Sequence, residues 1–196
     1  MDNRIATVER VTGETRITVT LNLDGTGKSQ CATGIGFFDH MLTGFAKHGL
    51  FDLELRCQGD LEVDTHHSIE DIGIALGEAI KITVGDKRGI RRYGHFTLPM
   101  DEALILCALD LSGRPFYVSD VKYTAERIGE LETEMFAEFF YALSYSAAMN
   151  LHFRQLGGLN NHHIAEASFK AFAKALDMAT AIEPRIQDVW STKGSL

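Results

Sequence analysis

One pattern of histidine and glutamate occurs twice in the chain, as His66-His67-x-x-Glu70 and as His162-His163-x-x-Glu166. On a helix, each glutamate lies three and four positions from its two histidines and shares a face with either of them. Adjacent histidines diverge by roughly 100° around the helix axis, so one ion cannot easily bind both rings. Each tetrad is therefore expected to contribute ligands to two metal ions.

A histidine pair at a helix start can also be a surface or capping feature that binds no metal. Residues suited to helix capping precede both tetrads, with Asp64 and Thr65 before the first and Asn160 and Asn161 before the second. Both tetrads are therefore expected to begin helices. Because the two copies stand in matching context, we interpret them as metal ligands.

The elements that position the tetrads repeat in the same order along the chain. Alternating or apolar runs predict strands, and apolar residues at helical spacing predict helices. In the first half we expect strands over 4–11, 15–23 and 28–33, a helix over 37–47, a strand over 51–57 and a helix over 66–84. In the second half we expect strands over 95–100, 103–111 and 116–121, a helix over 134–149, a strand over 151–156 and a helix over 163–181. The sequence predicts an α/β (α+β) fold of two duplicated β-β-β-α-β-α halves, each a four-stranded sheet backed by two helices.

Glycine and charged residues over 85–89 mark a boundary. We divide the chain into half-domain repeats over residues 1–93 and 94–196 within one compact domain. Glu14 and Glu102 each precede a glycine by eleven residues, so they occupy equivalent positions in the two halves. Counting back from each tetrad to the preceding helix makes Glu138 the positional partner of His40. Each half then offers four metal ligands, which are His40, His66, His67 and Glu70 in the first and Glu138, His162, His163 and Glu166 in the second.

The ligand types narrow the choice of metal. Imidazole and carboxylate without thiolate suit manganese, iron or zinc, and eight ligands over two ions leave about four per ion. A six-coordinate ion then keeps open positions for substrate. This favours two Mn(II) ions per active site, with zinc as the alternative.

Composition excludes several classes of protein. The chain has 196 residues, of which 45% are apolar, so it can bury a substantial core. Its net charge of −8 argues against a nucleic-acid partner, which requires a basic face. No apolar leader or run long enough to cross a membrane is present, so we expect a cytoplasmic protein. The odd number and the spacing of Cys31, Cys57 and Cys107 indicate buried, reduced thiols.

Several longer motifs are spread over almost the whole chain. They are residues 34–42 (GIGFFDHML), 64–71 (DTHHSIED), 85–89 (GDKRG), 99–103 (PMDEA), 110–115 (DLSGRP), 162–172 (HHIAEASFKAF) and 191–194 (STKG). With these motifs the chain resembles the imidazoleglycerol-phosphate dehydratase family. The resemblance implies conversion of imidazole glycerol phosphate into imidazole acetol phosphate in histidine biosynthesis, with two Mn(II) ions per site. It also implies homo-oligomers, with trimers assembled into a 24-subunit particle and active sites formed between subunits.

The resemblance also implies the roles of individual residues. Glu14 matches a substrate-contacting glutamate and is our candidate base for the carbon-bound proton, while Glu166, His48 and Lys170 would assist proton transfer. Substrate contacts would come from Glu14, His40, His48 and Lys170, and the phosphate would be bound by Arg92, Arg114, Ser191, Thr192 and Lys193. Without the resemblance, these residues have ordinary structural interpretations. Glu14 would be a solvated carboxylate, and Arg91 and Arg92 would be part of a solvated turn. Lys170 would be the partner of Glu166 in a helical ion pair.

In the expected reaction, the imidazole ring loses its N–H proton and its electrons expel the hydroxyl to give a diazafulvene. Loss of the next carbon's proton gives an enol, which ketonises to the product. Two positions depart from the family pattern. Glu138 stands where many members have histidine, and Gly44 stands where members often have glutamine, so one phosphate contact fewer is expected.

Two other functions are compatible with the metal ligands. A di-metal hydrolase would use a metal-bound hydroxide to cleave its substrate. A non-enzymatic metal-binding assembly protein would take up metal and assemble without turnover. The latter has no use for the cluster of Arg114 and Lys193.

Overall fold

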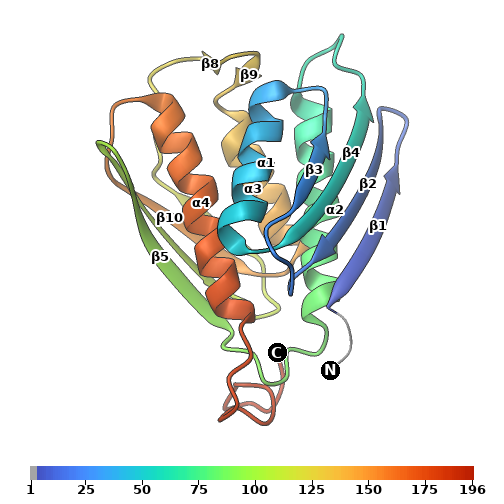
Figure 1. The fold of residues 1–196 in the computed structure, drawn as a ribbon, viewed down its shortest axis with the longest axis vertical. Helices are drawn as coiled ribbons and strands as arrows, with labels where there is room; N and C mark the ends of the chain where they lie inside the picture. Colours follow the sequence, from blue (N-terminus) through green and yellow to red (C-terminus); the bar gives the residue numbers. More distant parts are fainter. Residues whose placement is uncertain (1–3) are drawn as a thin grey trace.

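Two four-stranded sheets of identical strand order form the outer layers of the molecule (Figure 1). The structure is a computed structural model that describes residues 4–196, so residues 1–3 of the predicted first half-domain lie outside it. The first sheet has the order β1 (Ile5–Val11), β2 (Thr15–Asn22), β4 (Asp52–Gly59), β3 (Ser29–Ala32). The second has the order β5 (Tyr93–Met100), β6 (Ala103–Asp110), β10 (Asn150–Gly157), β7 (Phe116–Ser119). In both sheets the last pair is parallel and the others are antiparallel, which confirms the predicted duplication.

Four helices lie between the two sheets (Figure 1). They are α1 (Gly36–Gly49), α2 (His66–Val84), α3 (Met135–Ser146) and α4 (Asn161–Thr180). Helix α2 packs against α3 and α1 packs against α4, so each helix pair takes one member from each half. The rings of Phe38, Phe139 and Phe169 meet between the helices, with centroid distances of 5.1 to 6.1 Å. The halves therefore share one core, and the division into half-domains at residue 93 stays a prediction.

Small residues allow helices from the two halves to approach closely. A Cβ atom added at Gly73 of α2 would lie 2.8 Å from the carbonyl oxygen of Phe139 in α3. A Cβ atom at Gly77 would lie 2.5 Å from the carbonyl oxygen of Leu143. Both distances are too short for any side chain, so a larger residue here would push α3 away from α2. This contact fixes the helix that carries the first tetrad relative to the helix that carries Glu138.

All four helices begin at the same end of the molecule, which is at the top of Figure 1. The β1–β2 turn with Glu14 and the β5–β6 turn with Glu102 lie at this end too. The C-terminal segment after α4 lies at the opposite end. The strand and helix directions thus gather Glu14, Glu102 and both tetrads at one end of the molecule.

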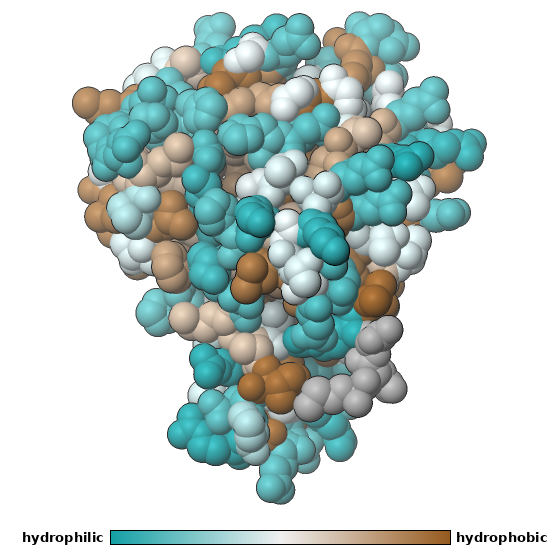
Figure 2. Space-filling view, in the orientation of Figure 1, coloured by the Kyte–Doolittle hydropathy of each residue, from teal (hydrophilic) through white to brown (hydrophobic). Residues whose placement is uncertain are grey.

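Hydrophilic residues cover much of the face seen in Figure 2, with apolar residues scattered between them. The buried residues are mostly apolar, as in the alternating pattern of β2, which buries Ile17, Val19 and Leu21. All three cysteines are free thiols, as predicted, but only Cys107 is buried, whereas Cys31 and Cys57 are half-buried. Burial raises the pKa of Cys31 to about 12, so this thiol is not ionised at neutral pH.

Most predicted boundaries agree with the structure to within two residues, and two larger differences remain. A short hairpin of β8 (Arg127–Ile128) and β9 (Leu131–Glu132) was not predicted, because two-residue strands have no recognisable periodicity. Helix α3 ends at Ser146 and not at Met149. Ala148 adopts a left-handed φ of 52°, which ends the helical path before β10 begins.

Candidate active site

Each tetrad occupies the first turn of its helix, as predicted. At α4, the side chain of Asn160 accepts hydrogen bonds from the backbone N–H groups of His162 and His163. At α2, Asp64 Oδ1 accepts from the N–H of His66 at 2.8 Å, whereas the side chain of Thr65 does not cap the helix. These bonds satisfy N–H groups that have no partner within the helix. Both histidine pairs are thereby held at the helix ends.

Three metal-binding side chains converge at the N-terminus of α4. His162 Nε2 lies 3.0 Å from Glu166 Oε2, and His40 Nε2 of α1 lies 3.5 Å from the same oxygen. Their ligand atoms all lie within 4.8 Å of one another, and within residues 4–196 they form the one such group of three. Two imidazole nitrogens and a carboxylate oxygen suit a divalent transition metal. The group joins His40 from the first half to two residues of the second.

Glu166 is also bound by a lysine. Lys170 Nζ lies 2.7 Å from Glu166 Oε1, one helical turn away. Burial alone would raise the pKa of Glu166, but the Lys170 ammonium and the contact with His162 outweigh it and hold the pKa below its usual value. Glu166 is therefore a carboxylate at neutral pH, the form that binds a metal ion.

The first tetrad reproduces only part of this arrangement. His66 Nε2 lies 3.9 Å from Glu70 Oε2, in the same i,i+4 relation as His162 and Glu166. Glu138, the positional partner of His40, is half-buried on α3. In the described part of the chain, Glu138 makes no ion pair with His66 and belongs to no metal-binding group of three. Metal binding by Glu138 stays a prediction.

The second histidine of each tetrad points away from the first. The ring planes of His66 and His67 are 85° apart, and those of His162 and His163 are 81° apart. His67 Nδ1 lies 2.9 Å from Asp60 Oδ2, and His163 Nδ1 lies 2.7 Å from Glu102 Oε2. These hydrogen bonds raise the pKa of both histidines. His163 also lies near Asp101, with Nε2 3.7 Å from Oδ2.

Glu14 occupies the turn between β1 and β2, and its side chain is about half exposed. Its Oε1 atom lies 3.6 Å from His67 Nε2, and this is the one ion pair of its carboxylate within residues 4–196. The backbone N–H of Glu14 is held by the hydroxyl of Thr12. The position of the residue is thus fixed by its backbone, while its carboxylate remains accessible to a ligand.

His48 and Lys170 lie near each other on the packed helices α1 and α4. His48 is exposed as a whole, and partial desolvation of its ring, followed by the charge of Lys170, lowers its pKa below the usual value. A neutral imidazole can accept a proton or a hydrogen bond. The structure thus places His48 and Lys170 near Glu166, as the proposed roles require.

The predicted phosphate-binding residues gather in a second cluster. Arg92, Arg114, Ser191, Thr192 and Lys193 all line one cavity of about 390 Å³. Arg92 donates from Nε and Nη2 to the carboxylate of Asp110 at 2.7 and 3.0 Å, and from Nη1 to the carbonyl of Trp190 at 2.8 Å. Most donors of Arg92 are therefore used within the chain. Arg114 and Lys193 make no ion pair within residues 4–196, which leaves their charges available to an anion.

The two clusters lie at opposite ends of α4. The N–H of Arg92 donates to the carbonyl of Ala179 at 2.8 Å, in the last turn of the helix, whereas His162 is in the first. With 17 positions between His162 and Ala179, the helix separates them by roughly 26 Å at 1.5 Å per residue. The structure therefore does not bring the predicted metal ligands and phosphate-binding residues into one site within a single chain.

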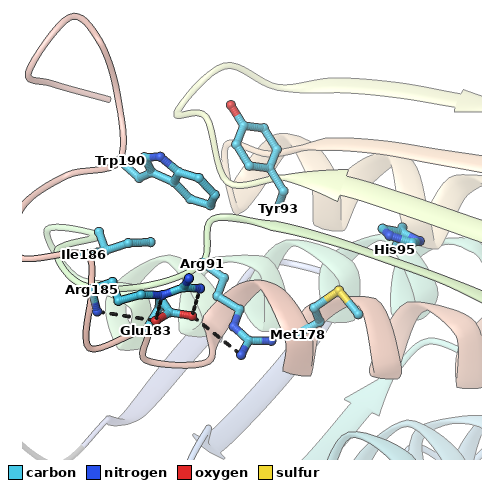
Figure 3. A pocket seen from close by; sticks show the side chains of 8 residues that line it. All are labelled: Arg91, Tyr93, His95, Met178, Glu183, Arg185, Ile186 and Trp190. Carbon is cyan, nitrogen blue, oxygen red and sulfur yellow. Dashed lines mark hydrogen bonds and ion pairs between the residues drawn. The ribbon is translucent and has the colours of Figure 1, made fainter.

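A second cavity, of about 630 Å³, adjoins the phosphate cluster (Figure 3). The rings of Tyr93 and Trp190 pack edge to face across it, with centroids 5.8 Å apart. Glu183 pairs with Arg185 at 2.7 Å and with Arg91 at 3.8 Å. These contacts, together with backbone bridges from Arg88 and Ile90, anchor the C-terminal segment beside β5. The positions of Ser191 to Lys193 thus depend on this anchoring.

Some residues of the two clusters were not identified as site residues from the sequence. Asp60 and Glu102 hold the second histidines, Asp101 lies beside His163, and Asp110 holds Arg92. Glu102 could have been identified from the sequence as a site residue, because it and Glu14 lie the same number of residues before their glycines. No local pattern distinguishes Asp60, because its partner is seven residues away across a turn.

The search for relatives gives a consistent result. The family model for imidazoleglycerol-phosphate dehydratase matches residues 33–176. The imidazoleglycerol-phosphate dehydratase of Lachnoclostridium phytofermentans is 61% identical over 99% of this chain and 99% of its own length. The crystal structure of the Staphylococcus aureus enzyme matches with 36% identity and a TM-score of 0.83, over 91% of this chain and 99% of that one. The structure of the Pyrococcus furiosus enzyme in complex with (S)-C348 also has 36% identity and a TM-score of 0.83, over 96% and 100%.

Within residues 4–196, no helix combines the length and the apolar character that crossing a membrane requires. The cytoplasmic location stays a prediction.

The family model covers most of the chain, the sequence relative matches it nearly end to end, and the solved structures share its duplicated fold. The chain therefore belongs to the imidazoleglycerol-phosphate dehydratase family of hydro-lyases.

Proposed function

We propose that this chain dehydrates imidazole glycerol phosphate to imidazole acetol phosphate in histidine biosynthesis. The observation that supports this most directly is the convergence of His40, His162 and Glu166 at the N-terminus of α4, with Lys170 on the same glutamate. Such a group can hold a divalent metal next to a proton-transfer site. The reaction itself is inferred from the family to which the chain belongs.

We propose that each active site binds two Mn(II) ions. Their ligands would be His40, His66, His67, Glu70, Glu138, His162, His163 and Glu166. The fit rests on the donor chemistry, since two imidazoles and one oxygen of Glu166 converge without a thiolate, while Lys170 contacts the other oxygen of Glu166. Bound metal would stabilise negative charge on the imidazole ring of the substrate. Zinc is the alternative that the same donors allow.

The residues near the histidines would perform the proton transfers. Glu14, with an accessible carboxylate beside His67, would remove the carbon-bound proton after the hydroxyl has left and a diazafulvene has formed. Glu166, His48 and Lys170 would hold or move the proton of the imidazole ring and of the departing hydroxyl. His40 would also contact the substrate. These roles require each group to lie within hydrogen-bonding reach of the bound substrate.

The phosphate would be bound by the cluster of Arg92, Arg114, Ser191, Thr192 and Lys193. Because about 26 Å of helix separates this cluster from the histidines of its own chain, it cannot bind the phosphate of a substrate whose imidazole lies at those histidines. We propose that each active site combines the histidines of one chain with the phosphate cluster of another. A homo-oligomer, in the form of trimers assembled into a 24-subunit particle, would provide this arrangement.

The proposed reaction is tested with one assay. Protein loaded with Mn(II) and given imidazole glycerol phosphate should form an enolisable ketone, which is detected by its absorbance in alkali. Release of inorganic phosphate without ketone would support a di-metal hydrolase. Metal uptake without any turnover would support a metal-binding assembly protein.

A further inference from the structure

The second histidine of each tetrad is held through the same ring nitrogen. His67 Nδ1 contacts Asp60 Oδ2 at 2.9 Å, and His163 Nδ1 contacts Glu102 Oε2 at 2.7 Å. An ionised carboxylate can only accept a hydrogen bond, so Nδ1 carries the hydrogen in both contacts. In a neutral ring this leaves the lone pair on Nε2, which is then the atom able to bind a metal ion.

The two carboxylates occupy different positions in the duplicated halves. Glu102 lies in the β5–β6 turn, where the register of the repeat places Glu14 in the β1–β2 turn. Asp60 follows β4, and the residue that follows β10 is Gly158. The first half therefore uses Asp60 for the contact that Glu102 makes in the second. As a result, Glu14 is not bound to Nδ1 and lies instead 3.6 Å from Nε2 of His67.

The surroundings of the two carboxylates indicate that each has a specific role. Asp60 Oδ1 is buried and has no hydrogen-bond partner within residues 4–196. This oxygen adds no hydrogen bond to the fold, and the one side-chain hydrogen bond of Asp60 within these residues is to His67. Glu102 uses its other oxygen to accept from the N–H groups of Leu159 and Asn160 at 3.1 and 2.7 Å. These two bonds fix Glu102 to the loop that leads into α4.

We propose that Asp60 and Glu102 are positioning residues that hold His67 and His163 as Nδ1–H tautomers and direct Nε2 toward the metal. Asp60 in the first half also leaves Glu14 free to act on the substrate. The inference rests on the proposed function, in which both histidines bind metal. Duplication thus produced two equivalent glutamates, of which one became a support for a ligand and the other a candidate base.

The first test is the Mn(II) affinity of Asp60 variants of the full chain, measured from the electron paramagnetic resonance signal of free Mn(II). Asp60→Ala should weaken the affinity roughly 10- to 100-fold, which is typical for loss of a group that orients a metal-binding histidine. Asp60→Asn keeps an acceptor oxygen and should recover part of that loss. Glu62→Ala removes an exposed charge from the same loop and should leave the affinity unchanged.

Thermal melting of the metal-free variants separates positioning from folding. Asp60→Ala should melt near the wild-type temperature, and its kcat should largely recover at saturating Mn(II). Glu102→Ala should also weaken Mn(II) binding, but it loses two backbone contacts as well, so Asp60 is the decisive position. Wild-type Mn(II) affinity in Asp60→Ala would overturn the inference. If the wild-type protein itself binds no Mn(II), the proposed metal function fails instead.

A second measurement reads the tautomers in the wild-type protein and needs variants only to assign the signals. Solid-state NMR of metal-free wild-type protein with ¹⁵N-labelled histidine reports the tautomer of each neutral ring. At a pH that keeps both rings neutral, His67 and His163 should be Nδ1–H tautomers, with assignment by His67→Gln and His163→Gln. Nε2–H tautomers at these two positions would overturn the inference.

Discussion

The guanidinium group of Arg92 forms a two-point contact with the carboxylate of Asp110, with Nε and Nη2 2.7 and 3.0 Å from its two oxygens. The side chains are only 10% and 19% exposed. This contact raises the pKa of Arg92 further above its already high value. Arg92 also donates to the carbonyl of Trp190, so its side chain links Asp110 at the end of β6 to the C-terminal segment with Ser191 and Lys193.

Loss of Asp110 should therefore destabilise the protein and the phosphate cluster together. Asp110→Ala leaves the charge of Arg92 mostly buried and unpaired, which should cost about 3 kcal/mol. Melting temperatures at fixed protein concentration measure this loss. The control Arg154→Ala removes the exposed pair with Asp120 and should cost less than about 1 kcal/mol. Equal melting temperatures for the two variants would contradict the structural role of Asp110.

Glu14→Gln should abolish most of the activity without loss of metal. The amide cannot take a proton, and general-base catalysis is typically worth about 10² or more in kcat. The metal content should stay nearly constant, because Glu14 is not a proposed ligand. Steady-state kinetics and metal analysis of the same sample provide the comparison, with Glu62→Gln as the control. A wild-type kcat in Glu14→Gln would transfer the role of base to Glu166 or to a bound water.

Both tetrads are predicted to serve the same pair of metals. His67→Ala and His163→Ala should each lose metal and activity together, because adjacent histidines of a helix diverge and each pair is proposed to serve two ions. Metal analysis and turnover of each variant test this. Full occupancy and full turnover in either variant would rule out a shared site.

Removal of metal should also change the assembly. If ligands from neighbouring chains complete each site, a chelator removes contacts that hold the chains together. Light scattering should then show smaller oligomers, while circular dichroism shows unchanged secondary structure. An unchanged particle mass after demonstrated metal removal would contradict this prediction.

Lys193→Ala should mainly raise KM, because Lys193 is proposed to bind a phosphate remote from the reacting carbons. Some loss of kcat is also expected if phosphate binding positions the substrate. The effect should exceed that in relatives with glutamine at the equivalent of Gly44, since this chain is expected to have one phosphate donor fewer.

Gly44→Gln should partly offset the effect of Lys193→Ala. A Cβ atom at Gly44 meets no other atom within 4 Å, so the helix has room for a side chain. Gly44→Ala is the matched control, because it also gains the roughly 1 kcal/mol of helix propensity over glycine but adds no hydrogen-bond donor. A lower KM in Gly44→Gln than in Gly44→Ala supports a phosphate contact at this position. Equal KM values would remove position 44 from the phosphate site.

Local sequence patterns predicted most of the elements and the candidate metal ligands. The alternation in residues 15–22 gave β2, and the capping residues Asp64 and Asn160 marked where α2 and α4 begin. These features depend on neighbours a few residues away, so periodicity and capping chemistry reveal them. The repeated tetrad and the count between Glu14 and Glu102 revealed the duplication in the same way.

Only the tertiary structure decided which of these residues meet. His40 joins His162 and Glu166 because α1 packs on α4 across the two halves, and Asp60 reaches His67 because the loop after β4 turns back toward α2. The separation of the phosphate cluster from the histidines follows from the length of α4 and from the bond between Arg92 and Ala179. Such contacts join residues distant in the chain, and their partners are selected by the packing of the whole core, which no local pattern of residues contains.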